Sequence, residues 1–169
     1  LYEITEGNPF FVTELLASSP SGGEGIPASV RDAVWSRIGR LEGSERELLE
    51  MMSIVPSSIE PWLLRSMMGE KADAAADTCV ARGLLQRDGH GNLKFRHELA
   101  RKATLERLPP NVQKALHAQV EEILSREAPT QLSRRVHHAA GSDNAQRVLS
   151  LAPLAAAQSA GLGSHLEAA

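Results

Sequence analysis

The sequence lacks the residues that several classes of protein require: it has few cysteines, no long apolar run and no excess of basic residues. Its 169 residues include a single cysteine, Cys79, so an intramolecular disulfide is excluded and a reducing, cytoplasmic environment is expected. No apolar run approaches the roughly 20 residues that a membrane-spanning helix needs, and no signal peptide is recognisable. Basic residues are not in excess, since 18 Lys and Arg stand against 21 Asp and Glu. The composition therefore predicts neither a membrane protein nor a broad surface for nucleic acid.

Motifs for catalysis and metal binding are missing as well. The chain has no G-x-S-x-G nucleophile motif, and the glycines at residues 22–25 lack the G-K-S/T ending of a phosphate-binding loop. The stretch His97 to Arg101 has arginine where the H-E-x-x-H zinc motif requires its second histidine. His137 and His138 are adjacent, so on a helix they point about 100° apart, and we interpret them as ordinary surface or interface histidines. The sequence thus predicts no catalytic residue and no metal site.

The patterns that are present predict a mainly α fold. Hydrophobic residues make up 42% of the chain and charged residues 23%, as in an ordinary globular protein. Ser44 and Glu47 form an S-x-x-E capping box at the start of one helix, and Gly83 is a suitable residue to end another. The expected helices cover approximately residues 8–16, 27–41, 44–55, 61–68, 72–82, 97–108 and 112–124, with an alanine-rich helical segment after residue 132.

One segment reads as β structure. Residues 84–87 and 93–96 flank the loop Asp88 to Asn92, which is rich in residues that tolerate positive φ. Leu93 and Phe95 alternate with polar residues, as in a half-buried strand. In a winged helix, three helices are followed by a β-hairpin. Residues 42–108 have this predicted order and are therefore expected to form a winged-helix-like unit.

Two short segments have chemistry of interest. Gly7, Asn8 and Pro9 begin a helix whose unpaired N–H groups could receive an anion, although every helix has such an end and a simple cap is the plainer interpretation. His97 lies between the hairpin and the next helix, where it could donate to a phosphate. Taken alone, a histidine there is more often a cap or a packing residue.

The order of three stretches resembles a known family. Gly7 to Leu16 (GNPFFVTELL), Ile26 to Leu41 and Phe95 to Leu99 (FRHEL) follow one another as in the large LuxR-family transcriptional regulators, which contain a P-loop signal-transduction (STAND) ATPase. The first stretch resembles the G-x-P segment of the ATPase helical lid, and the last resembles the M-H-D-type segment that ends its winged-helix domain. His137 to Ala139, followed by the alanine-rich stretch around Pro153, resembles the first helices of the repeat region.

This resemblance implies a domain organisation. Residues 1–41 would be the end of the ATPase helical lid, 42–108 the winged-helix-like domain, and 109–169 a helical linker with the start of a TPR-like repeat region. The chain would then be a piece of a longer protein, an expectation that fits its first residue, Leu1. An upstream P-loop domain would be its partner in the same chain, and further repeats and a DNA-binding domain would follow.

The resemblance also implies a nucleotide switch. ATP or ADP would bind mainly to the P-loop domain, with Pro9 near the adenine and His97 reaching the diphosphate. Gly7, Asn8, Pro9 and His97 are therefore the implied nucleotide-binding residues. ADP would hold the modules closed, and exchange for ATP would release them. Without the P-loop and the magnesium site, the chain alone is expected neither to be an enzyme nor to bind nucleotide tightly. One departure is Arg96, which stands where the family more often has a hydrophobic residue.

Other interpretations stay open at this stage. A DNA-binding winged helix would use residues 72–82 to read DNA, but this segment is alanine-rich and carries Asp73 and Asp77, so direct nucleic-acid binding is not expected. A helical scaffold for protein interactions would use Gly7 to Pro9 and His97 only as helix caps. A similar ATPase could also carry a cyclase or kinase instead of a transcriptional output.

Overall fold

A computed structural model describes residues 32, 35–41 and 43–161 of the chain. Two compact units, Leu1–Leu108 and Pro109–Ala169, make up the fold, and each is described separately. None of the helices in these described residues is long and apolar enough to cross a membrane. The predicted mainly α fold with one β-hairpin is confirmed.

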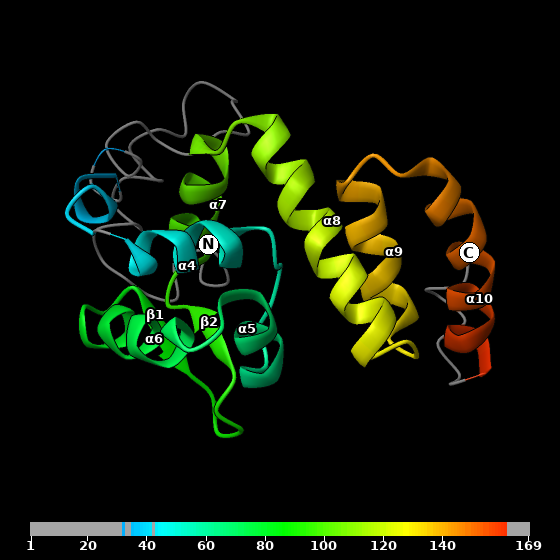
Figure 1. Ribbon diagram of the computed structural model, residues 1–169, viewed down its shortest axis with the longest axis horizontal. Helices are drawn as coiled ribbons and strands as arrows, with labels where there is room; N and C mark the ends of the chain where they lie inside the picture. Colours follow the sequence, from blue (N-terminus) through cyan, green and yellow to red (C-terminus); the bar gives the residue numbers. More distant parts are fainter. Residues whose placement is uncertain (1–31, 33–34, 42, 162–169) are drawn as a thin grey trace, which may run out of the picture. The chain divides into compact units, whose positions relative to one another are not determined.

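The first unit combines helices with the hairpin (Figure 1). A helical turn at residues 35–38 precedes the labelled elements. These elements are α4 (Ser44–Ser53), α5 (Pro61–Met68), α6 (Lys71–Ala81), β1 (Leu85–Arg87), β2 (Leu93–Phe95) and α7 (Glu98–Arg107). Helix α4 packs against α6 and α7, and α5 packs against α6. The bounds of α5 agree with the sequence prediction, as expected for a helix with proline in its first turn.

The hairpin is attached to the helices at both of its strands. β1 and β2 pair antiparallel with Leu85 opposite Phe95. Leu93 also forms an isolated bridge with Ile59, in which the two backbones exchange hydrogen bonds of 2.8 and 2.9 Å. A helix, a short bridging segment, two further helices and a hairpin follow one another in this unit, which is the element order expected of a winged helix.

Apolar side chains from every element of this unit form its core. Leu48 and Leu49 of α4 and Leu63 of α5 are fully buried. The others with less than 2% exposure include Leu41, Leu64, Ala72, Ala75, Ala76, Cys79, Leu85, Leu93 and Ala103. Burying a leucine side chain contributes roughly 1.5–3 kcal/mol, so this core accounts for the packing of α4, α5 and α6 around the hairpin.

Two helix ends test the capping predictions. Gly83 has φ +69° and follows α6, where the N–H groups of Gly83 and Leu84 donate to the carbonyls of Val80 and Cys79. The predicted glycine at the end of this helix is thus confirmed, in a Schellman arrangement. The predicted capping box at the start of α4 is wrong. Gly43 occupies the N-cap position with φ 54°, and no side chain caps the helix.

The Cys79 thiol should be unreactive toward thiol reagents in the folded protein. Its side chain is fully buried, and burial together with the Glu45 carboxylate raises its pKa from 9.0 to about 12. Because the thiolate is the reactive form, we expect Ellman's reagent to modify the folded chain at least about 1,000-fold more slowly than the denatured chain. Absorbance of the released thionitrobenzoate measures the rate, and Cys79 is the sole thiol. Equal rates with and without denaturant would contradict the buried position.

The second unit is made of consecutive helices. They are α8 (Pro110–Glu127), α9 (Leu132–Gly141) and α10 (Ala145–Gly161). Helix α9 packs against both α8 and α10, so each helix contacts its neighbour in sequence. The connections are only a few residues long, which favours antiparallel neighbours, as in helical repeat proteins. The buried residues between them include Val120, Leu124, Ala139 and Leu151.

Candidate functional site

The structure describes only one of the residues implied as nucleotide ligands. Gly7, Asn8 and Pro9 lie outside the described residues, and so does the predicted approach of Pro9 to His97. His97 is the N-cap residue of α7, with extended backbone (φ −137°, ψ 128°) and a partly exposed side chain. Its carbonyl accepts from the N–H groups of Ala100 and Arg101. The predicted position of His97 between the hairpin and a helix is therefore confirmed.

Glu98, which follows His97, forms an ion pair with Arg101. Both carboxylate oxygens of Glu98 accept from the Arg101 guanidinium, with distances of 2.6–3.0 Å. Another Arg101 nitrogen donates to the carbonyl of Ser53 at the end of α4. The Arg101 guanidinium thus neutralises the negative charge of Glu98 in the first turn of α7. The partial positive charge at the N-terminus of this helix is therefore less compensated than it would be by an unpaired Glu98.

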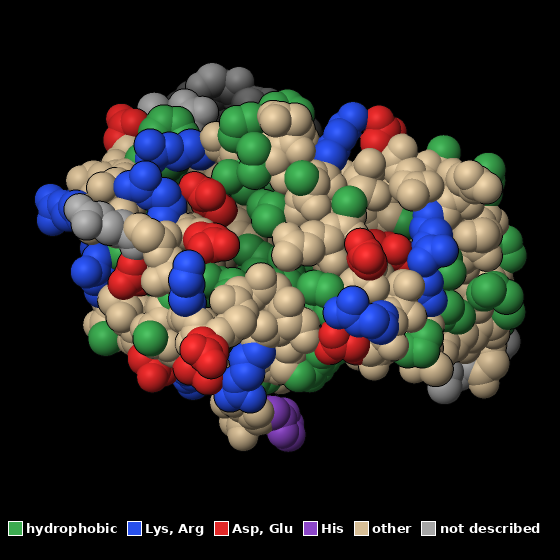
Figure 2. All heavy atoms as spheres, viewed as in Figure 1, with side chains coloured by type: hydrophobic (Ala, Val, Ile, Leu, Met, Phe, Trp, Pro, Cys, Tyr) green, Lys and Arg blue, Asp and Glu red, His purple; other side chains and the backbone are tan. Residues whose placement is uncertain are grey.

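Three arginines line a cavity in this unit. The cavity has a volume of about 530 Å³, and its described lining consists of Arg37, Arg40, Arg82 and Leu84. All three arginines are exposed. Figure 2 shows Lys and Arg side chains on the flank that carries α6 and the 35–38 helical turn, with Asp and Glu side chains interspersed among them. The described lining contains no carboxylate and no histidine.

Local packing positions the first two arginines. The indole Nε1 of Trp35 donates to the carbonyl of Ala103 at 3.0 Å and holds the helical turn against α7. Ile38 and Leu41 of the same segment are buried, with 4% and 1% exposure. Arg37 and Arg40 precede these two anchors by one residue each, so they lie on the solvent side of the segment.

The third arginine is set by the end of α6. Arg82 is the C-cap residue of this helix, and its Nη1 donates weakly to the carbonyl of Arg40 at 3.4 Å. Gly83 then turns the chain into β1. The N–H of Arg96 donates to the carbonyl of Leu84 at 3.0 Å, and the Arg96 Nη1 lies next to Gly83. The segment that leads to His97 is therefore hydrogen-bonded directly to a residue of the cavity.

The pairing of these arginines differs from that of others in the chain. Arg65 pairs with Asp73, and Arg87 pairs with Asp77. Among the described residues, no carboxylate is paired with Arg37, Arg40 or Arg82. Guanidinium groups bind phosphate oxygens through two parallel hydrogen bonds and stay charged at all physiological pH values. A cavity with this lining can bind a phosphate-rich or otherwise polyanionic ligand, and it supplies no described group for acid–base chemistry.

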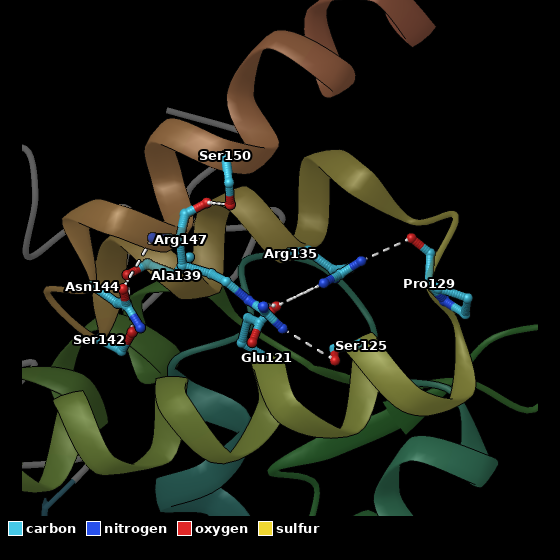
Figure 3. Close-up of polar contacts among 9 residues, drawn as sticks. All are labelled: Glu121, Ser125, Pro129, Arg135, Ala139, Ser142, Asn144, Arg147 and Ser150. Atoms are coloured by element: carbon cyan, nitrogen blue, oxygen red, sulfur yellow. Dashed lines mark hydrogen bonds and ion pairs between the residues drawn. The ribbon is translucent and has the colours of Figure 1, made fainter.

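The second unit contains a polar cluster in which one carboxylate is shared by two guanidinium groups (Figure 3). The Oε1 of Glu121 accepts from the guanidinium of Arg135 at 3.1 and 3.3 Å and from the Arg147 Nε at 3.1 Å. Arg135 also donates to the carbonyl of Pro129, and Arg147 donates to Ser125 Oγ. Because Glu121 and Arg135 are both buried and paired, this cluster is structural.

Sequence patterns alone did not identify either cluster. The alternation of buried and exposed residues around Ile38 places Arg37 and Arg40 on the surface, so two of the cavity arginines could have been found. Arg82 is 42 residues from Arg40, and only the tertiary structure brings it to the cavity.

Comparison of the chain with protein-family models, with curated proteins and with solved structures finds no match.

Proposed function

We propose that this chain is the regulatory part of a nucleotide-switched signalling ATPase, in which its winged-helix-like unit contacts the phosphates of ADP or ATP. The nucleotide would be held mainly by a P-loop domain elsewhere in the same protein. The observation that carries the proposal is the cavity of Arg37, Arg40 and Arg82, whose described lining is cationic and free of carboxylates. The motif order that resembles the LuxR-family ATPases supports it independently.

The physical principle of such a switch is linkage. A ligand that touches two modules stabilises the arrangement in which both contacts exist. Arginines on this unit, with His97 at the start of α7, would supply the second set of contacts. ADP would then favour the closed arrangement, and exchange for ATP would favour the open one.

The remaining parts of the proposal follow from the resemblance. The output would be transcriptional, through a DNA-binding domain outside this chain, and further helical repeats would continue the second unit. The protein would act in the cytoplasm, in keeping with its lone buried cysteine. This chain would catalyse no reaction by itself.

Direct DNA binding by the winged-helix-like unit is less well supported. Helix α6 would be the reading helix, and its exposed Asp73 and Asp77 each hold an arginine of a neighbouring element. Acidic side chains on this face repel DNA phosphates, and a reading helix usually presents several basic or amide side chains.

Removing cavity arginines should weaken the binding of ADP. We expect the double variant Arg40→Ala/Arg82→Ala to lower the affinity for ADP at least about tenfold, because hydrogen bonds to charged groups contribute roughly 1.5–3 kcal/mol each. NMR titration of the isotope-labelled chain with magnesium-free ADP is suited to weak binding. Shifted resonances should include those of Arg37, Arg82 and His97.

The matched control is Arg65→Ala, an exposed arginine whose removal leaves the cavity intact. It should bind ADP like the unmodified chain.

In the longer protein, His97→Ala should speed ADP release and raise basal activity. Absence of ADP-induced shifts, or equal shifts in the double variant, would contradict the proposal. Salt-dependent binding of duplex DNA without ADP binding would favour the winged-helix alternative.

A further inference from the structure

Three histidines meet in the second unit. His117 belongs to α8, and His137 and His138 belong to α9. One ring nitrogen from each lies within 4.8 Å of the others. The ring centroids are 4.9–5.4 Å apart. Because both helices belong to the same compact unit, this meeting is a feature of its internal packing.

The adjacency of His137 and His138 does not prevent a shared site. The sequence analysis interpreted them as ordinary histidines that point apart on one helix. The structure shows instead that His138 is buried, with 1% exposure, while His137 is exposed. His117 enters from the neighbouring helix and lies within 5.0–5.4 Å of both rings, which brings three imidazoles to one point.

A glycine makes this approach possible. Gly141 follows His138 by three residues and His137 by four, so it lies on the same side of α9. A Cβ at position 141 would lie 2.4–2.5 Å from three atoms of the His117 ring, including Nδ1. Any side chain at position 141 would therefore overlap the His117 imidazole, and the ring or the backbone would have to shift.

The two buried rings are in the form that binds metals. Their Nδ1 atoms are 2.9 Å apart, so one donates and the other accepts in a hydrogen bond between neutral rings. Burial, followed by the charge of His137, lowers the pKa of His117 to about 4. Burial, followed by the His117 and His137 imidazoles and the Arg134 guanidinium, lowers the pKa of His138 to about 3. Neutral imidazoles offer a lone pair without losing a net proton.

We propose that His117, His137 and His138 form a binding site for one divalent transition-metal ion at the contact between α8 and α9. Imidazole nitrogens suit Zn²⁺, Cu²⁺ and Ni²⁺ and disfavour Mg²⁺ and Ca²⁺, which prefer oxygen. For Zn²⁺, the Zn–N distance of 2.0–2.1 Å in a tetrahedral site separates two ligand nitrogens by about 3.4 Å. The Nδ1 atoms of His117 and His138 would therefore need to separate by about 0.5 Å.

The geometry also defines the remaining coordination position. With three protein ligands, a water molecule would complete a tetrahedral Zn²⁺ site, on the solvent side where His137 is exposed. The Nδ1 proton shared by the buried pair would be replaced by a proton on Nε2, so the net charge of the two rings does not change. Arg134, one turn before His138, opposes the cation, so the affinity should be lower than in closed four-ligand sites.

Titration of ZnCl₂ into the complete chain, followed by calorimetry in a chelator-free buffer, tests the proposal. We expect one Zn²⁺ per chain, with no heat from MgCl₂. His137→Ala should lower the Zn²⁺ affinity at least about tenfold, since even residues behind metal ligands affect affinity 10–100-fold. His137 is exposed, so this variant should melt like the unmodified chain in EDTA. His90→Ala, an exposed histidine of the hairpin loop, is the matched control and should bind Zn²⁺ normally.

Cobalt provides a second measurement. Co²⁺ should give visible d–d absorption of the strength typical of a four- or five-coordinate site, and Zn²⁺ should displace it. A chain that binds no Zn²⁺, or binds it with the same affinity as His137→Ala, would overturn the proposal. Neither result would bear on the arginine cavity, which lies in the other unit.

Discussion

Replacement of Glu121 by leucine should destabilise the unit of α8, α9 and α10 by about 3–5 kcal/mol, because it leaves the buried guanidinium of Arg135 without its carboxylate. The side chains of these two residues are only 11% and 10% exposed. Arg147, the other partner of Glu121, is 42% exposed and can return to water. The lost pairing of Arg135 therefore dominates the expected effect.

A double-mutant cycle separates the buried charge from the loss of packing. Glu121→Leu/Arg135→Leu removes both charges and should be markedly more stable than Glu121→Leu alone, since apolar replacement of a whole buried pair is often neutral or stabilising. Hydrogen exchange of the α8 and α9 amides measures the stability of this unit directly. Arg147→Ala should cost no more than about 1 kcal/mol. Equal costs for Glu121→Leu and Arg147→Ala would contradict the structural role of the buried pair.

Gly141→Ala is expected to be the second most damaging substitution, at about 1–3 kcal/mol. The new methyl group would overlap the His117 ring. This ring is rigid, and His117 is only 9% exposed. A shift of the ring would disturb its hydrogen bond with His138, whose Nδ1 lies 2.9 Å from that of His117. The melting temperature followed by circular dichroism should fall by several degrees.

Gly161→Ala is the matched control for this substitution. Gly161 also ends a helix in the same unit, but a Cβ there would meet no atom within 4 Å. Since alanine favours helix more than glycine does, this control should be neutral or slightly stabilising. In a Gly141→Ala/His117→Ala chain the overlap disappears, so the two costs should not add. Full additivity would show that the His117 ring is not what excludes a side chain at position 141.

Local signals in the sequence predicted most elements of the fold. Pro61 places the start of α5, Gly83 ends α6, and the Asp88–Asn92 loop closes the hairpin, where the Asp88 carboxylate accepts from Asn92. These features depend on residues within a few positions of one another. The capping box at Ser44 failed because Gly43, with positive φ, leads the chain into the helix without a side-chain cap.

The clusters of chemical interest were harder to predict, because each one joins separate helices. His117 and His138 are 21 residues apart, and their meeting depends on how α8 packs against α9. Glu121 occupies a buried position in a helix of otherwise ordinary amphipathic pattern. Periodicity assigns a residue to a face of its own helix, but it does not specify which residue of another helix will lie opposite.

The two units also differ in how far along the chain their contacts reach. In the second unit, Arg135 and Glu121 are 14 residues apart, and Lys114 and Asp143 are 29 residues apart. In the first, Trp35 is hydrogen-bonded to Ala103 across 68 residues. Closing the longer loop costs about 0.8 kcal/mol more in chain entropy than closing one of 29 residues. On the ribosome, Trp35 must wait until Ala103 has emerged, so Arg37 and Arg40 reach their final positions only when synthesis of the first unit is nearly complete.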